Sequence, residues 1–186
     1  ALLSAATALK DGQLKESLAI AENLQQQFPE RVEPLKMVAT IYLSVGDWRR
    51  GKSLLEQALT LEPMDPSAVK TLAKIYLRTG EEARAVQLLT PYLKENPQDK
   101  EAIGVMSELI VATNPYQQGE TQLIELLEKH PENLEVKARL AQLYFDNGQY
   151  DQVLFRTENM SDDVIKAQPL LMELRGKALI NQGGAD

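Results

Sequence analysis

The hydrophobic residues of the chain recur at the spacing of amphipathic helices. In the stretch "LKMVATIY" the apolar side chains stand at i, i+3, i+4 and i+7, which places them on one helical stripe: Leu35, Val38, Ala39 and Tyr42. A second stripe follows at Leu54, Leu55, Ala58 and Leu59. The spacing therefore predicts two consecutive helices rather than strands.

Turn residues separate these two helices. Gly46 ends the first helix because glycine adopts the left-handed conformation without a Cβ penalty, and Asp47 is suited to cap the second. Pro63 stops the second helix, and Asp65 followed by Pro66 begins another. One unit is thus helix, tight turn, helix and short turn.

The same unit is written several times along the chain at one constant spacing, the repeat interval, which separates Pro29 from Pro63. Prolines recur at this interval at Pro29, Pro63, Pro97 and Pro131, and turn residues recur at Gly12, Gly46, Gly80, Asn114 and Gly148. Small residues follow it at Ala5, Ala39, Ala73, Ser107 and Ala141, and tyrosines at Tyr42, Tyr76 and Tyr144, with Ile110 in between. Independent columns at one period predict a repeat protein whose units bury their apolar faces against their neighbours.

These columns resemble the tetratricopeptide repeat (TPR) pattern. The residues that carry the resemblance in one unit are Leu35, Val38-Ala39, Tyr42, Gly46, Gly51, Leu55 and Pro63. The unit from Pro66 matches similarly. The resemblance implies an all-α, right-handed α-solenoid of antiparallel helix pairs with about five repeats. We expect a single array with units at about 1–31, 32–65, 66–99, 100–133 and 134–168 and a partial unit at 169–186. The unit from Lys100 departs from the pattern, and there we expect Pro115 to be the first residue of a helix that Asn114 caps.

The two ends of the chain fall in phase with the repeat. "ALLSAATALK" has an alternative interpretation as the tail of a signal peptide, but it lacks a basic region, and Ala5 and Gly12 predict a structural helix instead. Near the other end, Gly176 supplies the small residue and Gly183 the turn, after a one-residue insertion in the loop between Met160 and Pro169. The array is thus expected to be a piece of a longer one. The final helix, about residues 170–181, should keep an uncovered side for a further repeat or for self-association.

Composition excludes several classes of function. With 20 basic and 27 acidic residues the net charge is −7, which disfavours a nucleic-acid partner. The sequence contains no cysteine, so thiolate metal sites and cysteine nucleophiles are excluded. No apolar run is long enough to predict a membrane span.

Catalytic motifs are missing. The sequence has no phosphate-binding loop, no G-x-G-x-x-G and no nucleophile elbow. His130 stands alone before Pro131, where a solvated histidine at a helix end is the expected state, and acidic pairs such as Glu81-Glu82 are expected to be solvated. We therefore expect neither an enzyme nor a cofactor nor a metal site.

The remaining chemistry is binding of a protein or peptide. The resemblance implies that the first helix of each unit lines a concave groove, and the groove residues would be Lys36, Thr40, Lys70, Lys74, Arg78, Glu108, Arg139 and Gln142. The three basic residues from Lys70 to Arg78 form a stripe at i, i+4 and i+8 that is either a solvated face or a site for an acidic or carboxylate group of a peptide. The asparagine pair of the clamp with which some family members bind chaperone tails is missing, because Thr40, Lys74, Glu108 and Gln142 stand at the comparable places.

Three classes of function follow from this sequence. The favoured one is an interaction scaffold with a ligand in the groove, the second is an array that assembles end to end, and the third is an enzyme. The closing stretch "LLMELRGKALINQG" resembles the bacterial TPR lipoproteins associated with exosortase sorting, and scaffolds of polysaccharide export are a further resemblance. Both resemblances imply a periplasmic or envelope location, which the residues themselves leave open against the cytoplasm.

Overall fold

A computed structural model describes residues 1–183 of the chain, and these residues form α-helices without any β-strand. The helices gather into two compact units, which are described separately: unit 1 comprises residues 1–95 and unit 2 begins at Asn96. The all-α fold expected from the hydrophobic spacing is confirmed.

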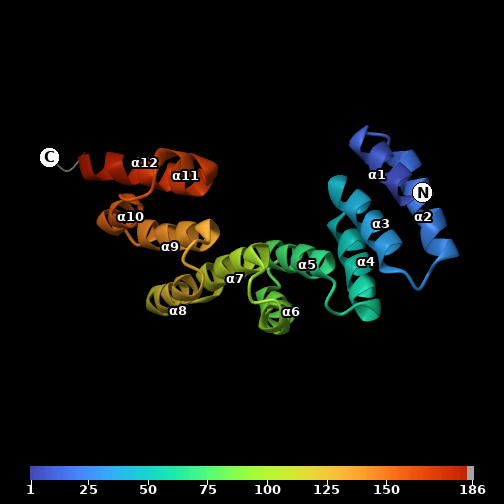
Figure 1. The fold of residues 1–186 in the computed structure, drawn as a ribbon, viewed down its shortest axis with the longest axis horizontal. Coiled ribbons are helices and arrows are strands. Elements are labelled where there is room, and N and C mark those ends of the chain that lie inside the picture. Colours follow the sequence, from blue (N-terminus) through green and yellow to red (C-terminus); the bar gives the residue numbers. More distant parts are fainter. Residues whose placement is uncertain (184–186) are drawn as a thin grey trace. The chain divides into compact units, whose positions relative to one another are not determined.

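Unit 1 consists of three antiparallel helix pairs (Figure 1). The pairs are α1 (Leu2–Lys10) with α2 (Leu14–Gln27), α3 (Val32–Ser44) with α4 (Trp48–Leu61), and α5 (Pro66–Arg78) with α6 (Glu82–Glu95). The second helix of a pair also contacts the first helix of the next pair, since α2 packs on α3 and α4 on α5. The first helices of neighbouring pairs meet as well, at the contact between α1 and α3.

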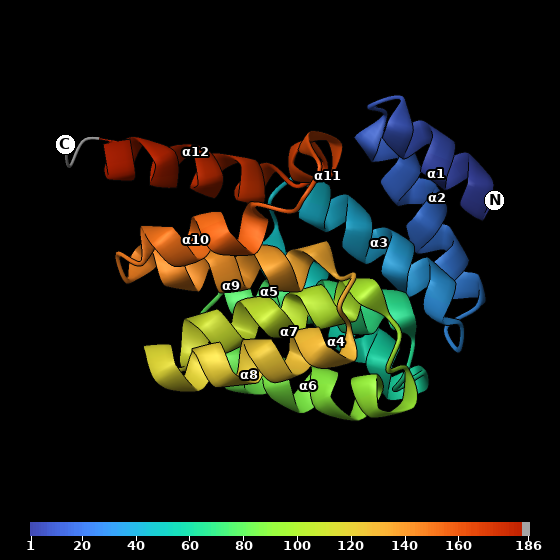
Figure 2. The same cartoon turned by 60° about the vertical axis from the view of Figure 1, so that its left-hand side comes forward.

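Unit 2 begins with the same arrangement and then departs from it. Its helices are α7 (Lys100–Thr113), α8 (Tyr116–Lys129), α9 (Leu134–Asp146), α10 (Tyr150–Thr157), α11 (Asp162–Ala167) and α12 (Pro169–Gly183). Figure 2 shows α9 beside α10, and α12 packs on both. The segment expected to be a loop between Met160 and Pro169 contains the short helix α11, which Ser161 caps by accepting a hydrogen bond from the Val164 N–H.

The periodic small residues lie where two helices meet. Ala5, Ala39, Ala73, Ser107 and Ala141 are all fully buried, with no exposed surface. A larger side chain at these places would push neighbouring helices apart, since protein interiors are close-packed. The prediction that this column encodes helix packing is confirmed.

The turns follow the sequence signals, with one exception. Gly12, Gly46, Gly80 and Gly148 have φ between 70° and 80°, the left-handed conformation expected after a helix. Asp47 and Asp65 cap α4 and α5 by accepting hydrogen bonds from the N–H groups of Arg50 and Ala68.

The expectation for Asn114 and Pro115 was wrong. Helix α8 begins at Tyr116, and Pro115 precedes it in an extended conformation with ψ of 154°. The side-chain amide of Asn114 turns back to donate to the Ile110 carbonyl at 3.0 Å, so it satisfies the end of α7 instead of capping α8. The last carbonyls of a helix lack internal partners, and a nearby amide donor meets that need. Gly183, expected to be a turn, is the last residue of α12.

Candidate functional site

A hollow of about 510 Å³ lies between the first helices of two neighbouring pairs in unit 1, α1 and α3. Its apolar lining is Leu2, Ala6, Leu9 and Met37, and its polar lining is Lys10, Glu33, Lys36 and Thr40. Two of the residues predicted from the sequence, Lys36 and Thr40, therefore line one hollow. The combination of an apolar floor and a charged rim is typical of sites that bind a side chain with one polar end.

Neighbouring groups hold the two predicted residues in place. Lys36 Nζ lies 2.6 Å from Asp65 Oδ2, so an ion pair joins α3 to the residue that caps α5. The Thr40 hydroxyl donates to the Lys36 carbonyl at 2.8 Å. Lys10 on α1 is exposed at the opposite edge of the hollow. The hollow therefore offers one cation paired within the protein and a second cation at its rim.

Sequence reasoning missed the residues that α1 contributes. Ala6 stands one repeat interval before Thr40, and Leu2 stands one repeat interval before Lys36, so the period carries the predicted positions directly onto α1. The apolar character of this part of the hollow could have been predicted by that step.

The basic stripe on α5 does not line this hollow. Lys70 is half-buried, Lys74 is exposed, and both interact with neighbouring groups of the protein. The Arg78 guanidinium lies 4.4 Å from the centroid of the Trp48 ring, a distance suited to a cation–π contact. The structure therefore brings Arg78 to α4, whereas Lys36 and Thr40 face α1.

The three predicted residues of unit 2 contact one another. Arg139 Nη2 lies 3.0 Å from Glu108 Oε2, and Arg139 Nη1 donates to Gln142 Oε1 at 3.0 Å. Glu135, which the sequence analysis missed, lies 2.8 Å from the same guanidinium and accepts a hydrogen bond from Gln168. Arg139 is largely buried and its Nε has no hydrogen-bond partner. This cluster thus ties α7 to α9 and joins α9 to the residue that precedes α12.

A second set of polar contacts recurs with the tyrosine column. In unit 1, Tyr76 donates its hydroxyl hydrogen to Glu56 Oε1 at 2.8 Å, and the Arg84 guanidinium lies over the Tyr76 ring and pairs with the same carboxylate at 2.8 Å. Burial, together with the hydrogen bond to Glu56, raises the pKa of Tyr76. Hydrogen bonds from Lys52, Thr79 and Arg84 lower the pKa of Glu81 to about 2.

The same tyrosine–glutamate contact appears in two other pairs. Tyr42 donates to Glu22 at 3.3 Å in unit 1, and Tyr144 donates to Glu120 at 2.8 Å in unit 2. The sequence analysis found the tyrosines and missed the carboxylates, although Glu22 and Glu56 are separated by one repeat interval.

The single histidine of the sequence lies at a helix end. His130 follows the last turn of α8 and lines a small hollow of about 210 Å³ with Pro131. Within residues 1–183, His, Cys, Asp and Glu side chains do not gather in threes that could hold a metal ion. In the same part of the chain, the helices are all too short or too polar to cross a membrane.

Successive antiparallel helix pairs with one packing pattern define a helical repeat protein. Residues 42–109 match the tetratricopeptide repeat family, as the resemblance predicted. No curated protein matches it in sequence.

Solved structures share this fold at low sequence identity. A tetratricopeptide repeat protein from Parabacteroides merdae has a TM-score of 0.77 and 18% identity, over 97% of this chain and 70% of that one. MamA from Desulfovibrio magneticus RS-1 has a TM-score of 0.68 and 16% identity, over 93% of this chain and 92% of that one. YrrB, described as a TPR protein with an unusual peptide-binding site, has a TM-score of 0.66 and 15% identity, over 92% of this chain and 88% of that one.

Proposed function

We propose that the chain is a non-catalytic interaction scaffold that binds a peptide segment of a partner protein along its first helices. The hollow between α1 and α3 is the observation that carries this proposal. Its apolar floor suits an aliphatic or aromatic side chain of the peptide, and Lys10 and Lys36 at its edge suit a neighbouring carboxylate. The basic residues of α5 extend the preference for acidic peptides. YrrB, which shares the fold and is described as having an unusual peptide-binding site, supports a peptide as the ligand.

Selection from a peptide library tests this function. We expect the protein to enrich peptides that combine an apolar residue with an acidic residue or a free C-terminal carboxylate. Replacement of both α5 lysines (Lys70→Glu with Lys74→Glu), or of the hollow floor (Met37→Glu), should weaken binding of an enriched peptide at least about tenfold, because each places a negative charge where the peptide's acid or apolar group would lie.

The matched control is the double reversal Lys15→Glu with Lys94→Glu. It changes the net charge equally but alters exposed residues on α2 and α6, outside the first helices. Circular dichroism should show the same helicity for all variants. Equal loss of affinity in the control, or unaltered affinity in the groove variants, would contradict the proposal.

Association of copies through α12 is the second candidate. Met172, Leu179 and Ile180 on α12 are 51%, 55% and 75% exposed, a set of apolar side chains that a further helix would cover. Sedimentation that depends on protein concentration separates this candidate from a monomeric scaffold. The proposal of an envelope location, in sorting or polysaccharide export, is tested by fractionating cells that produce the protein.

A further inference from the structure

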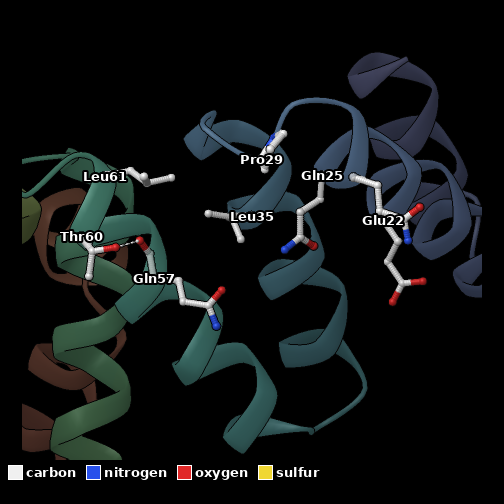
Figure 3. Close-up of a pocket in the computed structure, with 8 residues that line it drawn as sticks. Glu22, Gln25, Pro29, Leu35, Gln57, Thr60 and Leu61 are labelled. Carbon is white, nitrogen blue, oxygen red and sulfur yellow. Dashed lines mark hydrogen bonds between the residues drawn. The ribbon is translucent and has the colours of Figure 1, made fainter.

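We infer that the hollow between the second helices α2 and α4 is a separate binding site that takes an arginine side chain from a polypeptide partner. It measures about 630 Å³ and contains the carboxylate of Glu22. Figure 3 shows its construction: α2 and α4 supply the two walls, and Leu35 of α3 lies between them. This site is independent of the hollow between α1 and α3, because Leu35 and its neighbours here belong to a different set of lining residues.

The next repeat shows a corresponding carboxylate whose cation is supplied by the chain itself. A hollow of about 350 Å³ in that repeat is lined by Glu56, one repeat interval from Glu22, and by Arg84. There the Arg84 guanidinium lies 2.8 Å from Glu56 Oε1 and 4.4 Å from the centroid of the Tyr76 ring. Glu56 therefore has a tyrosine hydroxyl and a guanidinium as partners.

Glu22, which lines the first hollow, has the tyrosine partner without the guanidinium. Glu22 accepts the Tyr42 hydroxyl at 3.3 Å, and within residues 1–183 the structure places no cation in an ion pair with it. Arg50, at the position equivalent to Arg84, pairs instead with Asp47 at 3.5 Å while its guanidinium lies 5.1 Å from the Tyr42 ring centroid.

The chemistry of the lining fits an arginine in particular. Pro29, Leu35 and Leu61 provide apolar surface for the three methylene groups of its side chain. Glu22 offers a carboxylate, which a planar guanidinium binds with two parallel hydrogen bonds. The polar lining groups Gln25, Gln57 and Thr60 add acceptor oxygens, and the hollow contains no lysine or arginine that would repel a cation. The net charge of −7 favours the approach of a basic peptide.

Titration with a small arginine mimic tests the site. Increasing amounts of N-acetyl-L-argininamide, added to the ¹⁵N-labelled protein, are expected to shift the amide signals of Glu22, Gln25 and Gln57 in a saturable manner. N-acetyl-L-citrullinamide, which has nearly the same shape but no charge, should bind at least about tenfold more weakly, because the charge-assisted contact to the carboxylate is lost. Glu22→Gln should weaken the binding of argininamide by a similar factor, and Glu16→Gln, at an exposed position of the same helix, should leave it unchanged.

The second repeat supplies a test in the opposite direction. Arg84→Ala should leave Glu56 without its guanidinium partner, so that argininamide shifts the signals around Glu56 and raises the melting temperature of this variant, whereas it does neither at that place in the unaltered protein. Equal binding of citrullinamide, full binding by the Glu22→Gln variant, or shifts centred on Asp47 and Arg50 would each overturn the inference. If Arg84→Ala does not fold, the comparison of the two probes and of the Glu22 and Glu16 variants still decides it. The groove variants change Lys70, Lys74 and Met37, which do not line this hollow. The tests of the two sites are therefore independent of each other.

Discussion

Replacement of Leu89 by alanine is expected to lower the free energy of unfolding by about 3 kcal/mol. Leu89 lies on α6 and has no exposed surface. The substitution removes three buried carbon atoms and leaves a cavity, and the surrounding side chains of unit 1 collapse into such a cavity only in part. Because proteins of this size are only marginally stable, a loss of this magnitude is a large fraction of the total.

Urea unfolding measured by tryptophan fluorescence provides the test. Trp48, the single tryptophan of the sequence, lies on α4, so its emission reports on unit 1, to which Leu89 belongs. Val86→Ala is the control, because Val86 lies on the same helix but is 36% exposed, and its removal should cost less than about 1 kcal/mol. Equal shifts of the two variants would show that Leu89 does not belong to the packed core of unit 1.

The packing of the fold could be predicted from the sequence because it depends on residues that recur. The local signals are a helix stripe, a small residue at each crossing and a glycine after the first helices other than α7 and α12. Because these signals recur at one constant interval, chance does not explain them. The buried alanines and the left-handed glycines therefore lie where the sequence analysis placed them.

Where the pattern is broken, prediction was less accurate. The Asn114 side chain donates a hydrogen bond to the helix that precedes it and does not cap the helix that follows. An asparagine side chain can hydrogen-bond to either helix end, and the path of the chain determines which one it contacts. Helix α11 has only six residues, too few to show a hydrophobic period.

The candidate sites were harder to predict because specific contacts do not recur. The sequence identified Arg139. It could not show that the Arg139 guanidinium pairs with two carboxylates, those of Glu135 and of Glu108 on another helix. It identified Lys36 without its partner Asp65, which stands at the start of the next helix pair. Glu56 pairs with Arg84, whereas Arg50 pairs with Asp47 rather than with Glu22. Arg50 and Arg84 nevertheless occupy the same repeat position. Side-chain pairing of this kind follows from three-dimensional placement rather than from local spacing.

In one column of the second helices, the size of a single side chain decides whether it fits against the neighbouring helix. Its members, each one repeat interval from the next, are all buried and differ in size: Ser17, Gly51, Ala85, Gly119 and Val153. A methyl group on Gly51 would lie 2.5 Å from Leu43 Cδ2 and 2.6 Å from its Cγ, which is too close without a shift of Leu43. On Gly119 the nearest atom to an added methyl group would be Leu143 Cδ2, at an ordinary contact distance of 3.6 Å.

The same substitution at these two glycines is therefore expected to have opposite effects. Gly119→Ala should raise the free energy of unfolding by about 0.5–1 kcal/mol, because alanine loses less conformational freedom in a helix than glycine and has room for its methyl group. Gly51→Ala should lower it by about 1–2 kcal/mol, because the strain of moving Leu43 exceeds the same gain in helix propensity. Urea unfolding followed by circular dichroism measures both changes, and Gly51→Ala combined with Leu43→Ala should recover part of the loss by removing the clashing atoms. A gain of stability in both single variants would mean that α3 and α4 can move apart at no cost, and that the small residue at position 51 does not set the distance between them.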